Sequence, residues 1–461
     1  MSSVAQASEN SVISKSPRSI AQDLGEFVQS VKYDDLPSEA VQFAKALILK
    51  TVAGTLAGAA CPSAKQMVNL IRKRNLPEEV GIIGCSYRTS AWEGVLLNAF
   101  CGHVSELEDV GHSPGGVSWD ITVIPLMLTL AEKLQLSGRA TIEAVVAGLE
   151  VHYRTCLPLD ATPVGMVLPP TSAMGCAAAA AKALGLNAAQ ITAAMGFTLS
   201  CPSMAEASMG TDAHFLESSL HAMQGLIGAE MAAVGLTSNP DLTSYKGLLA
   251  KGVSFDDVTA ELFKRWYFTE IWIKKYPTCF LVHRQIDALL ELMASEKLRY
   301  DDIQAVEVHT GPGDACCDRP NPKTVGDMQF SFQHSLAVAM LNGSLKLEAF
   351  FMDVVDDPRI EAARRKVTVR IDRNIRYSVS LSEPTTVSVR TKGGKSYTKE
   401  KLSCLGSPSE PLSWEQFNQL YRHYAATRLS HPLVEQTMEM LWGLERLDNV
   451  AELMKILTFS K

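Results

Sequence analysis

Charged residues are scarce in this chain: they make up 20% of its 461 residues, and no basic run is longer than a few residues. With 50 acidic and 43 basic side chains, the formal net charge is -7. A nucleic-acid partner is therefore not expected, because binding to phosphates needs a concentrated positive surface. The hydrophobic share of 46% is enough for a large core, in two domains or in one domain with a substantial insertion.

Cysteine motifs are also missing. The ten cysteines are scattered along the chain and form no short-spaced framework, which fits reduced thiols and a cytoplasmic location. The adjacent Cys316 and Cys317 do not reproduce the Cys-x-x-Cys spacing of zinc and iron–sulfur sites. A dehydratase of the iron–sulfur type is therefore disfavoured.

Neither a long apolar run nor a targeting signal is visible. The densest apolar stretch, Ala173–Ala181, is too short to cross a membrane and is typical of closely packed helices. Residues Met1–Ser16 contain one lysine and no arginine, and they lack the apolar core of a secretion signal. We expect residues 1–18 to be a disordered tail, and we expect no membrane partner.

Residues 19–267 have helical periodicity and little strand pattern, as in the apolar series that starts at Ile20 and Leu24. Small residues recur where helices must approach closely, for example in Thr51–Ala60. Asn187 follows a Leu-Gly-Leu step and is a plausible N-cap for the next helix. These features predict a tight, all-helical bundle domain.

Residues 268–404 have a different pattern. Alternating segments predict strands at Ile303–His309, Val367–Ile371, Thr386–Arg390 and Ser396–Glu400. Helical patterns then return within residues 405–461, at 413–425 and 432–444. The predicted fold class is mainly α, with a large all-helical bundle domain, a smaller α+β lid domain, and C-terminal helices that return to the bundle. The cleft between the two parts is the natural ligand site.

The stretch Trp272–His283 combines cationic side chains with a phenol. Pro277 disfavours a helical conformation for Tyr276 and suits a first helical position, so we expect a helix from here to about Met293. The free N–H groups at such a start, beside Lys274, Tyr276 and His283, would suit a carboxylate or an oxyanion. The alternative interpretation is a solvated turn at Lys274 and a core histidine at position 283.

Two pairs of potential metal ligands occur at helical spacing, His103 with Glu106 and Asp109 with His112. Each could present two ligands on one helix face. Only one pair is convincingly helical, so the sequence favours no metal site.

Several of these segments together resemble the MmgE/PrpD family. The resemblance rests on the run Ile273–Cys279 that leads to His283, on Asp318–Pro322 followed by Phe330–Gln333, and on Pro411–Phe417. It spans about residues 19 to 457. It implies a helical domain with an α+β lid, a homodimer, no cofactor, and metal-free lyase chemistry, either decarboxylation or dehydration, on small polycarboxylates.

Residue by residue, the family pattern is only partly kept. Lys274, His283 and the acidic run Glu106–Asp109 match it, whereas His214 stands at a family lysine and His334 at a family tyrosine. Met166 and Trp119 stand near positions where the family has histidines. The resemblance thus implies catalytic candidates Lys274, His334, His214, His112 and Asp109, and substrate-binding candidates Tyr276, His283, Met166, Trp119, Glu106 and Arg319.

The replacements remove fixed positive charge and supply apolar walls, with Phe215 as a third wall beside Met166 and Trp119. A tricarboxylate would lose charged hydrogen bonds of about 1.5 to 3 kcal/mol each, so we expect a less anionic, larger substrate. Three function classes remain: a lyase acting on a carboxylate-bearing intermediate, an isomerase or cyclase acting on a neutral one, and a non-catalytic binding protein. The matching lysine and the candidate histidines, which titrate near neutral pH, favour an enzyme.

Overall fold

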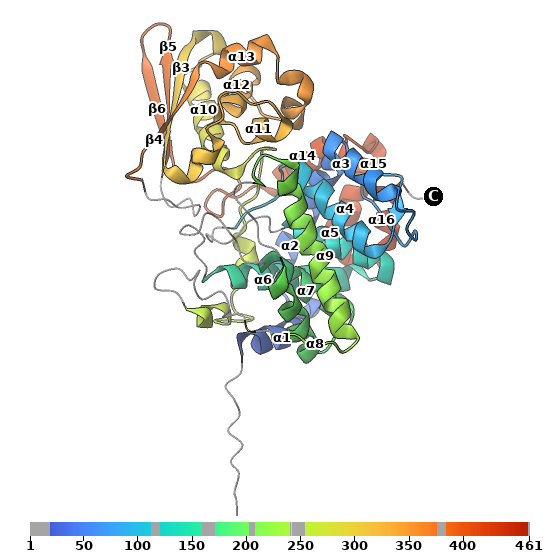
Figure 1. Cartoon of the computed structure of the whole chain (residues 1–461). Coiled ribbons are helices and arrows are strands. Elements are labelled where there is room, and N and C mark those ends of the chain that lie inside the picture. Colours follow the sequence, from blue (N-terminus) through green and yellow to red (C-terminus); the bar gives the residue numbers. More distant parts are fainter. Residues whose placement is uncertain are drawn as a thin grey trace, which may run out of the picture.

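The computed structural model describes residues 19–111, 120–158, 171–201, 208–239, 241, 254–375 and 384–459. The expected tail of residues 1–18 and three candidate site residues, His112, Trp119 and Met166, lie outside these ranges. Within them, the chain forms a large helical bundle and a smaller lid that contains a sheet (Figure 1). The predicted fold class, mainly α with an α+β lid, is confirmed.

The bundle is built from helices in the first half of the chain and from the C-terminal helices. Its elements are α1 (Ile20–Ser30), α2 (Ser38–Ala59), α3 (Pro62–Arg72), α4 (Ala91–Val104), α5 (Asp120–Leu134), α6 (Gly138–Cys156), α7 (Thr171–Ala183), α8 (Ala188–Phe197), α9 (Asp212–Ala233), α14 (Trp414–Ala425), α15 (His431–Trp442) and α16 (Ala451–Leu457). A small hairpin of β1 (Val80–Gly81) and β2 (Arg88–Thr89) lies beside them. The core is one large apolar cluster that joins both sets of helices.

Small residues allow the central helices to touch. A methyl group at Gly148 of α6 would lie 2.8 Å from the carbonyl oxygen of Gly175 on α7, so only glycine permits this approach. The predicted cap at Asn187 is confirmed, because its side chain accepts the N–H of Gln190 and completes a capping box. Helix α2 is long and apolar enough to cross a membrane, but 89% of its apolar window is buried inside the bundle, as expected of a core helix.

The lid contains a four-stranded sheet with helices against it. Its elements are α10 (His283–Ser295), β3 (Ile303–Thr310), α11 (Val325–Gln329), α12 (Phe332–Asn342), α13 (Pro358–Arg364), β4 (Val367–Ile371), β5 (Thr385–Thr391) and β6 (Ser396–Lys401). The strand order is β4-β3-β5-β6, with β3 and β4 parallel and the other pairs antiparallel. Helices α10 and α12 pack on the sheet (Figure 1). The predicted strands are confirmed to within one residue at each end.

The predicted helix start at Pro277 is wrong. Helix α10 begins at His283, after a 3-10 turn at Phe280–Val282. The N–H of Cys279 and the hydroxyl of Thr278 both donate to the carbonyl oxygen of Gln329, at 2.9 and 2.5 Å. These bonds to another part of the lid hold the backbone in a non-helical path, so the expected anion site at residue 277 does not form.

Candidate active site

An acidic turn at Ser105–Asp109 follows α4, and its three carboxylates point into the protein. Glu106 and Asp109 are fully buried and Glu108 is 5% exposed. Glu106 has a φ of +53°, a conformation that costs a residue with a side chain about 1 kcal/mol or more and that is often found at functional sites. This backbone conformation turns the chain sharply between α4 and the carboxylates.

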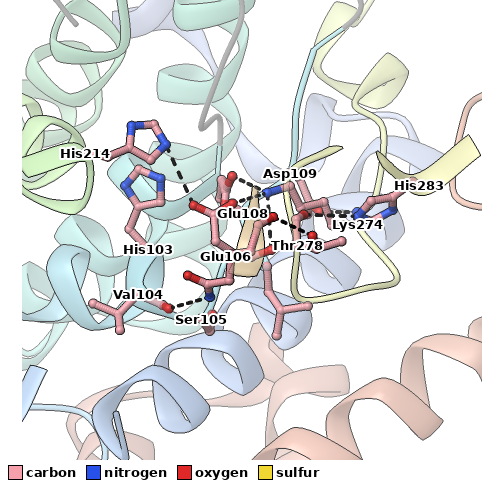
Figure 2. Close-up of polar contacts among 12 residues, drawn as sticks. His103, Val104, Ser105, Glu106, Glu108, Asp109, His214, Lys274, Thr278 and His283 are labelled. Atoms are coloured by element: carbon pink, nitrogen blue, oxygen red, sulfur yellow. Dashed lines mark hydrogen bonds and ion pairs between the residues drawn. The ribbon is translucent and has the colours of Figure 1, made fainter. Parts of the chain in front are cut away.

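The segment that carries Lys274 contacts this turn from the side of the lid. Val110 and Trp272 form an antiparallel bridge with hydrogen bonds of 3.1 and 2.8 Å, which aligns the two segments. The ammonium group of Lys274 then donates to the carboxylate of Glu106 at 2.9 Å, to the carbonyl oxygen of Glu106 at 3.2 Å, and to the carboxylate of Glu108 (Figure 2). The side chain is 1% exposed, so the lysine is enclosed rather than in solvent.

Burial and charge set the protonation of this group of residues. Burial alone lowers the pKa of Lys274, but the carboxylates of Glu106 and Glu108 outweigh it and raise that pKa above its usual range. Burial and the neighbouring Glu106 raise the pKa of Glu108 to about 7, against the opposing charge of Lys274. The site therefore holds a permanent cation beside a carboxyl group that titrates near neutrality.

Asp109 anchors the two segments to the bundle. Its carboxylate accepts the backbone N–H of Lys274 at 2.9 Å and an ion pair from Lys50 of α2. Its own N–H donates to Asp120 at 2.6 Å, and Asp120 accepts the hydroxyl of Thr51 at 2.7 Å. Burial raises the pKa of Asp109, and the ammonium group of Lys50 opposes this rise. These contacts make Asp109 a residue that positions the Lys274 backbone.

Two histidines approach Glu106 from the bundle side (Figure 2). His214, in the first turn of α9, has its Nε2 atom 3.8 Å from Glu106 and its Nδ1 atom 3.3 Å from Glu217. Burial lowers the pKa of His214, but the hydrogen bond that His214 donates to Glu217 and the charges of the nearby glutamates raise it above its usual value. His103 lies 4.5 Å from His214 between ring centroids, and burial together with this neighbour lowers its pKa well below the usual value. The two pKa shifts have opposite directions, so His214 binds a proton more readily than His103.

A cavity of about 660 Å³ is lined by residues next to His103 and His214 in the sequence, although neither histidine lines it. Phe215 lines it and also contacts the rings of His103 and His214, with centroids 5.4 and 6.2 Å away. The apolar wall also includes Val104, Leu347, Phe350, Phe351 and Met352. The cavity lies between the bundle and the lid, and its largely apolar wall suits a substrate with an extended uncharged part.

Models of two protein domains match this chain: the MmgE/PrpD N-terminal domain matches residues 22–259, and the MmgE/PrpD C-terminal domain matches residues 276–445. The chain belongs to the MmgE/PrpD family. The resemblance found in the sequence motifs is thus confirmed over most of the chain.

Characterised relatives of this family member carry the name cis-aconitate decarboxylase. The protein from Aspergillus terreus is 24% identical over 97% of this chain and 98% of its own length. The proteins from Mus musculus and Homo sapiens are also 24% identical, over 80% and 78% of this chain and 79% and 78% of their own lengths. The similarity therefore extends through both parts of the fold.

The MmgE/PrpD residues that were expected at the site fall into separate groups. Lys274, Glu106, Asp109 and His214 come together in the network described above. His283 lies behind Lys274: its Nε2 atom is 3.3 Å from the carbonyl oxygen of Thr278, and burial and Lys274 lower its pKa well below the usual value. Tyr276 donates its hydroxyl to Asp287 at 2.7 Å. These two side chains thus contact the inner structure of the lid.

His334 and Arg319 contact other parts of the lid. The Nε2 atom of His334 lies 2.7 Å from the carbonyl oxygen of Ala349, and its ring lies 5.6 Å from Phe350, a wall of the cavity. Burial lowers the pKa of His334 to about 4, although the bond to Ala349 opposes the change. Arg319 bonds to Asp327 and to the carbonyl oxygen of Met209, both at 3.0 Å. Arg319 thus joins the lid to the segment that leads into α9.

Sequence reasoning gave no role to Lys50 and considered His103 only as a metal ligand. The sequence context of Lys50 does indicate a buried ion pair. Lys50 is a lysine within the apolar run of α2, and such a residue needs a buried counter-charge. His103 lies three residues before Glu106, a spacing that brings two side chains close at the end of a helix. Their partners in the network lie far away in sequence, and no local pattern identifies them.

Proposed function

We propose that this protein is an MmgE/PrpD-type lyase that removes carbon dioxide or water from a small carboxylate-bearing molecule. Membership of the family and the relatives named cis-aconitate decarboxylase support a decarboxylase- or dehydratase-type lyase at family level. The substrate, by this proposal, carries fewer negative charges than a tricarboxylate and has a larger uncharged part.

One observation carries the proposal: a buried cation, two carboxylates and an imidazole with a raised pKa form a continuous network. Lys274 bonds to Glu106 and Glu108, and Glu106 faces the Nε2 atom of His214. Removal of carbon dioxide or water needs a fixed positive charge that stabilises the negative charge developing on the substrate. It also needs an acid or base at the reacting carbon. The network contains both, and it is shielded from water, which strengthens its electrostatic effect.

His214 is the proposed proton donor. In a decarboxylation, the carbon–carbon bond to the carboxylate breaks, carbon dioxide leaves, and the carbon that keeps the electron pair takes the proton from His214. In a dehydration, a carboxylate of the network takes the carbon-bound proton, and His214 protonates the departing hydroxyl group. Lys274 stabilises the negative charge that develops in either reaction.

The charge balance of the network supports a substrate with few carboxylates. Lys274 is matched by Glu106 and Glu108, and Lys50 is matched by Asp109. A substrate with three carboxylates would compete with buried glutamates for the same ammonium group, and every unpaired buried carboxylate would oppose binding. The apolar wall at Phe215 and Phe350 accommodates an uncharged part of the substrate instead.

The proposal is tested by incubating the purified protein with cis-aconitate and with 2-methylcitrate, and by assaying carbon dioxide and the dehydrated product. We expect slow turnover of at least one compound, and faster turnover of analogues in which one carboxylate is replaced by an uncharged chain. Lys274→Ala should abolish turnover, and His214→Gln should reduce it about 10²- to 10⁴-fold. A matched control is His309→Gln, a histidine on the lid that pairs with Asp372 at 3.2 Å, remote from the network.

The assignment of Lys274 fails if Lys274→Ala keeps full turnover while circular dichroism shows a folded protein. The same test applies to His334, another of the catalytic candidates, since His334→Ala should reduce turnover if the ring acts in the reaction. A reduction in stability alone would leave His334 as a packing residue. Both variants must therefore be compared at a temperature at which they are fully folded.

An isomerase or cyclase that acts on a neutral intermediate is the second candidate. It is favoured by the full pairing of both lysines with carboxylates, which leaves neither ammonium group dedicated to a substrate anion in the described structure. Two results together would support the isomerase or cyclase over the lyase. They are no turnover of either acid or of its analogues, and deuterium exchange from solvent into a larger neutral substrate.

A homodimer, a small-molecule substrate and a cytoplasmic location are part of the proposal. Light scattering coupled to size-exclusion chromatography tests the dimer directly. A monomeric mass at micromolar concentration would contradict it.

A further inference from the structure

Three potential metal ligands converge inside the bundle: His103 at the end of α4, Glu106 just after it, and His214 at the start of α9. Each offers one ligand atom, and these atoms lie within 4.8 Å of one another. The two histidines and the glutamate are buried, with at most 5% of any of them exposed. Figure 2 shows both rings on the same side of the Glu106 carboxylate, and their planes are tilted by 58° to each other.

Two of the three ligand atoms have no hydrogen-bond partner among the residues that the structure describes. They are the Nε2 atom of His103 and the Oε1 atom of Glu106. A buried polar atom without a partner costs free energy, and native proteins rarely leave one without a reason. The Oε1 atom of Glu106 lies 3.8 Å from the Nε2 atom of His214, and the ring of His103 lies 4.5 Å from that of His214 between centroids.

The opposite atom of each ligand is held in place by another residue. The Nδ1 atom of His103 bonds to Ser218 at 2.8 Å, and that of His214 bonds to Glu217 at 3.3 Å. The Oε2 atom of Glu106 bonds to Lys274 at 2.9 Å. Such outer bonds orient the ligands of metal sites and fix the tautomer of the histidines. Each side chain therefore presents its ligand atom to the same point.

We propose that His103, Glu106 and His214 form a binding site for a first-row transition dication such as Zn²⁺. Two imidazoles and one carboxylate are the donors that such ions prefer, whereas Mg²⁺ and Ca²⁺ prefer oxygen ligands alone. Tetrahedral bonds of about 2.1 Å place neighbouring ligand atoms about 3.4 Å apart, so small side-chain movements close the observed spacing. Glu108 balances the charge of Lys274, which allows a dication nearby.

The site has a consequence for catalysis that rests on the proposed function. Glu106 and His214 cannot transfer protons while they ligate an ion, so the bound ion acts as an inhibitor. The ion and the reaction compete for the same two side chains. Binding itself is independent of turnover and is measured without any substrate.

The test uses the full chain after treatment with a chelator. Zn²⁺ is titrated in a calorimeter, and Co²⁺ is added separately to record its ligand-field absorption, which reports nitrogen and oxygen ligands around the ion. We expect one ion per chain. His103→Gln should weaken binding at least tenfold, and Ser218→Ala, which removes only an outer bond, should weaken it about 10- to 100-fold.

His309→Gln is the control, because His309 and Asp372 form a histidine–carboxylate pair on the lid. It should bind Zn²⁺ as the unaltered protein does. The proposal is overturned if the unaltered protein takes up no stoichiometric ion, or if folded Ser218→Ala and His103→Gln bind with unchanged affinity. If the protein binds no ion but turns over substrate, the metal site is rejected and the proposed function is not. If the protein binds the ion but turns over no substrate, the proposed function is rejected and the metal site is not.

Discussion

The carboxylate of Asp109 accepts the backbone N–H of Lys274 at 2.9 Å, although 165 residues separate them in the sequence. Through the same carboxylate, Asp109 pairs with Lys50 in the middle of α2. The lid segment that carries Lys274 is thus tied to the central helix of the bundle. Because the ammonium group of Lys274 points at Glu106 and Glu108 from this fixed backbone, the network depends on how the lid joins the bundle.

Asp109→Ala should destabilise the fold strongly. It leaves the buried Lys50 without its counter-charge and the Lys274 N–H without its acceptor, and loss of one partner of a buried ion pair lowers the free energy of unfolding by about 3 kcal/mol. Urea denaturation followed by circular dichroism measures the change. Combining Asp109→Ala with Lys50→Met should restore part of the loss, so a double variant whose loss equals the sum of the single losses would contradict the pairing.

His214→Gln should reduce turnover about 10²- to 10⁴-fold, the range for loss of a positioned acid. Since His214 has a raised pKa and donates as the protonated ring, activity should fall as pH rises through that pKa. Glu217→Gln removes the hydrogen bond that contributes most to the increase, so the alkaline fall should move to lower pH. An unchanged pH profile in this variant would argue against His214 as the donor.

His334 should make the fold sensitive to acid. Its pKa is lowered to about 4 in the folded chain, whereas a histidine in the unfolded chain titrates near 6.5. Between these values the unfolded chain binds a proton that the folded chain does not, so stability falls as pH falls through this window, by about 3 kcal/mol in all. His334→Gln should remove this contribution. The measurement is the urea midpoint at pH 7 and at pH 4.5, with His309→Gln as the control.

Gly326→Ala should disturb the site from a distance. A methyl group on this residue of α11 would overlap the backbone carbonyl of Gly210, just ahead of α9, and would push the lid away from the helix that carries His214. We expect turnover to fall about tenfold or more, since small displacements of catalytic groups are costly. Gly393→Ala, in the turn between β5 and β6, is the control, because its methyl group would meet only Thr391 at 3.8 Å. Equal effects of the two substitutions would contradict the prediction.

Local patterns predicted the elements well where the local signal was strong. Strand β4 was predicted with its observed bounds, Val367–Ile371, and Asn187 was predicted as a helix cap. In both cases the evidence lies within a few residues: alternation of apolar side chains in one case, and a side chain next to unpaired N–H groups in the other. The start of α10 was missed because bonds to Gln329, about fifty residues away, override the local preference of Pro277.

The sequence by itself determined the division into a helical bundle and an α+β lid, and it placed an acidic run at Glu106–Asp109 and a lysine at position 274. Periodicity and short motifs carry that information. Only the tertiary structure decided that Lys274 is enclosed by Glu106 and Glu108, and that His103 and His214 face one of the same carboxylates. Those contacts join segments that lie far apart in the chain, and their energies depend on burial, which arises only when the bundle and the lid pack together.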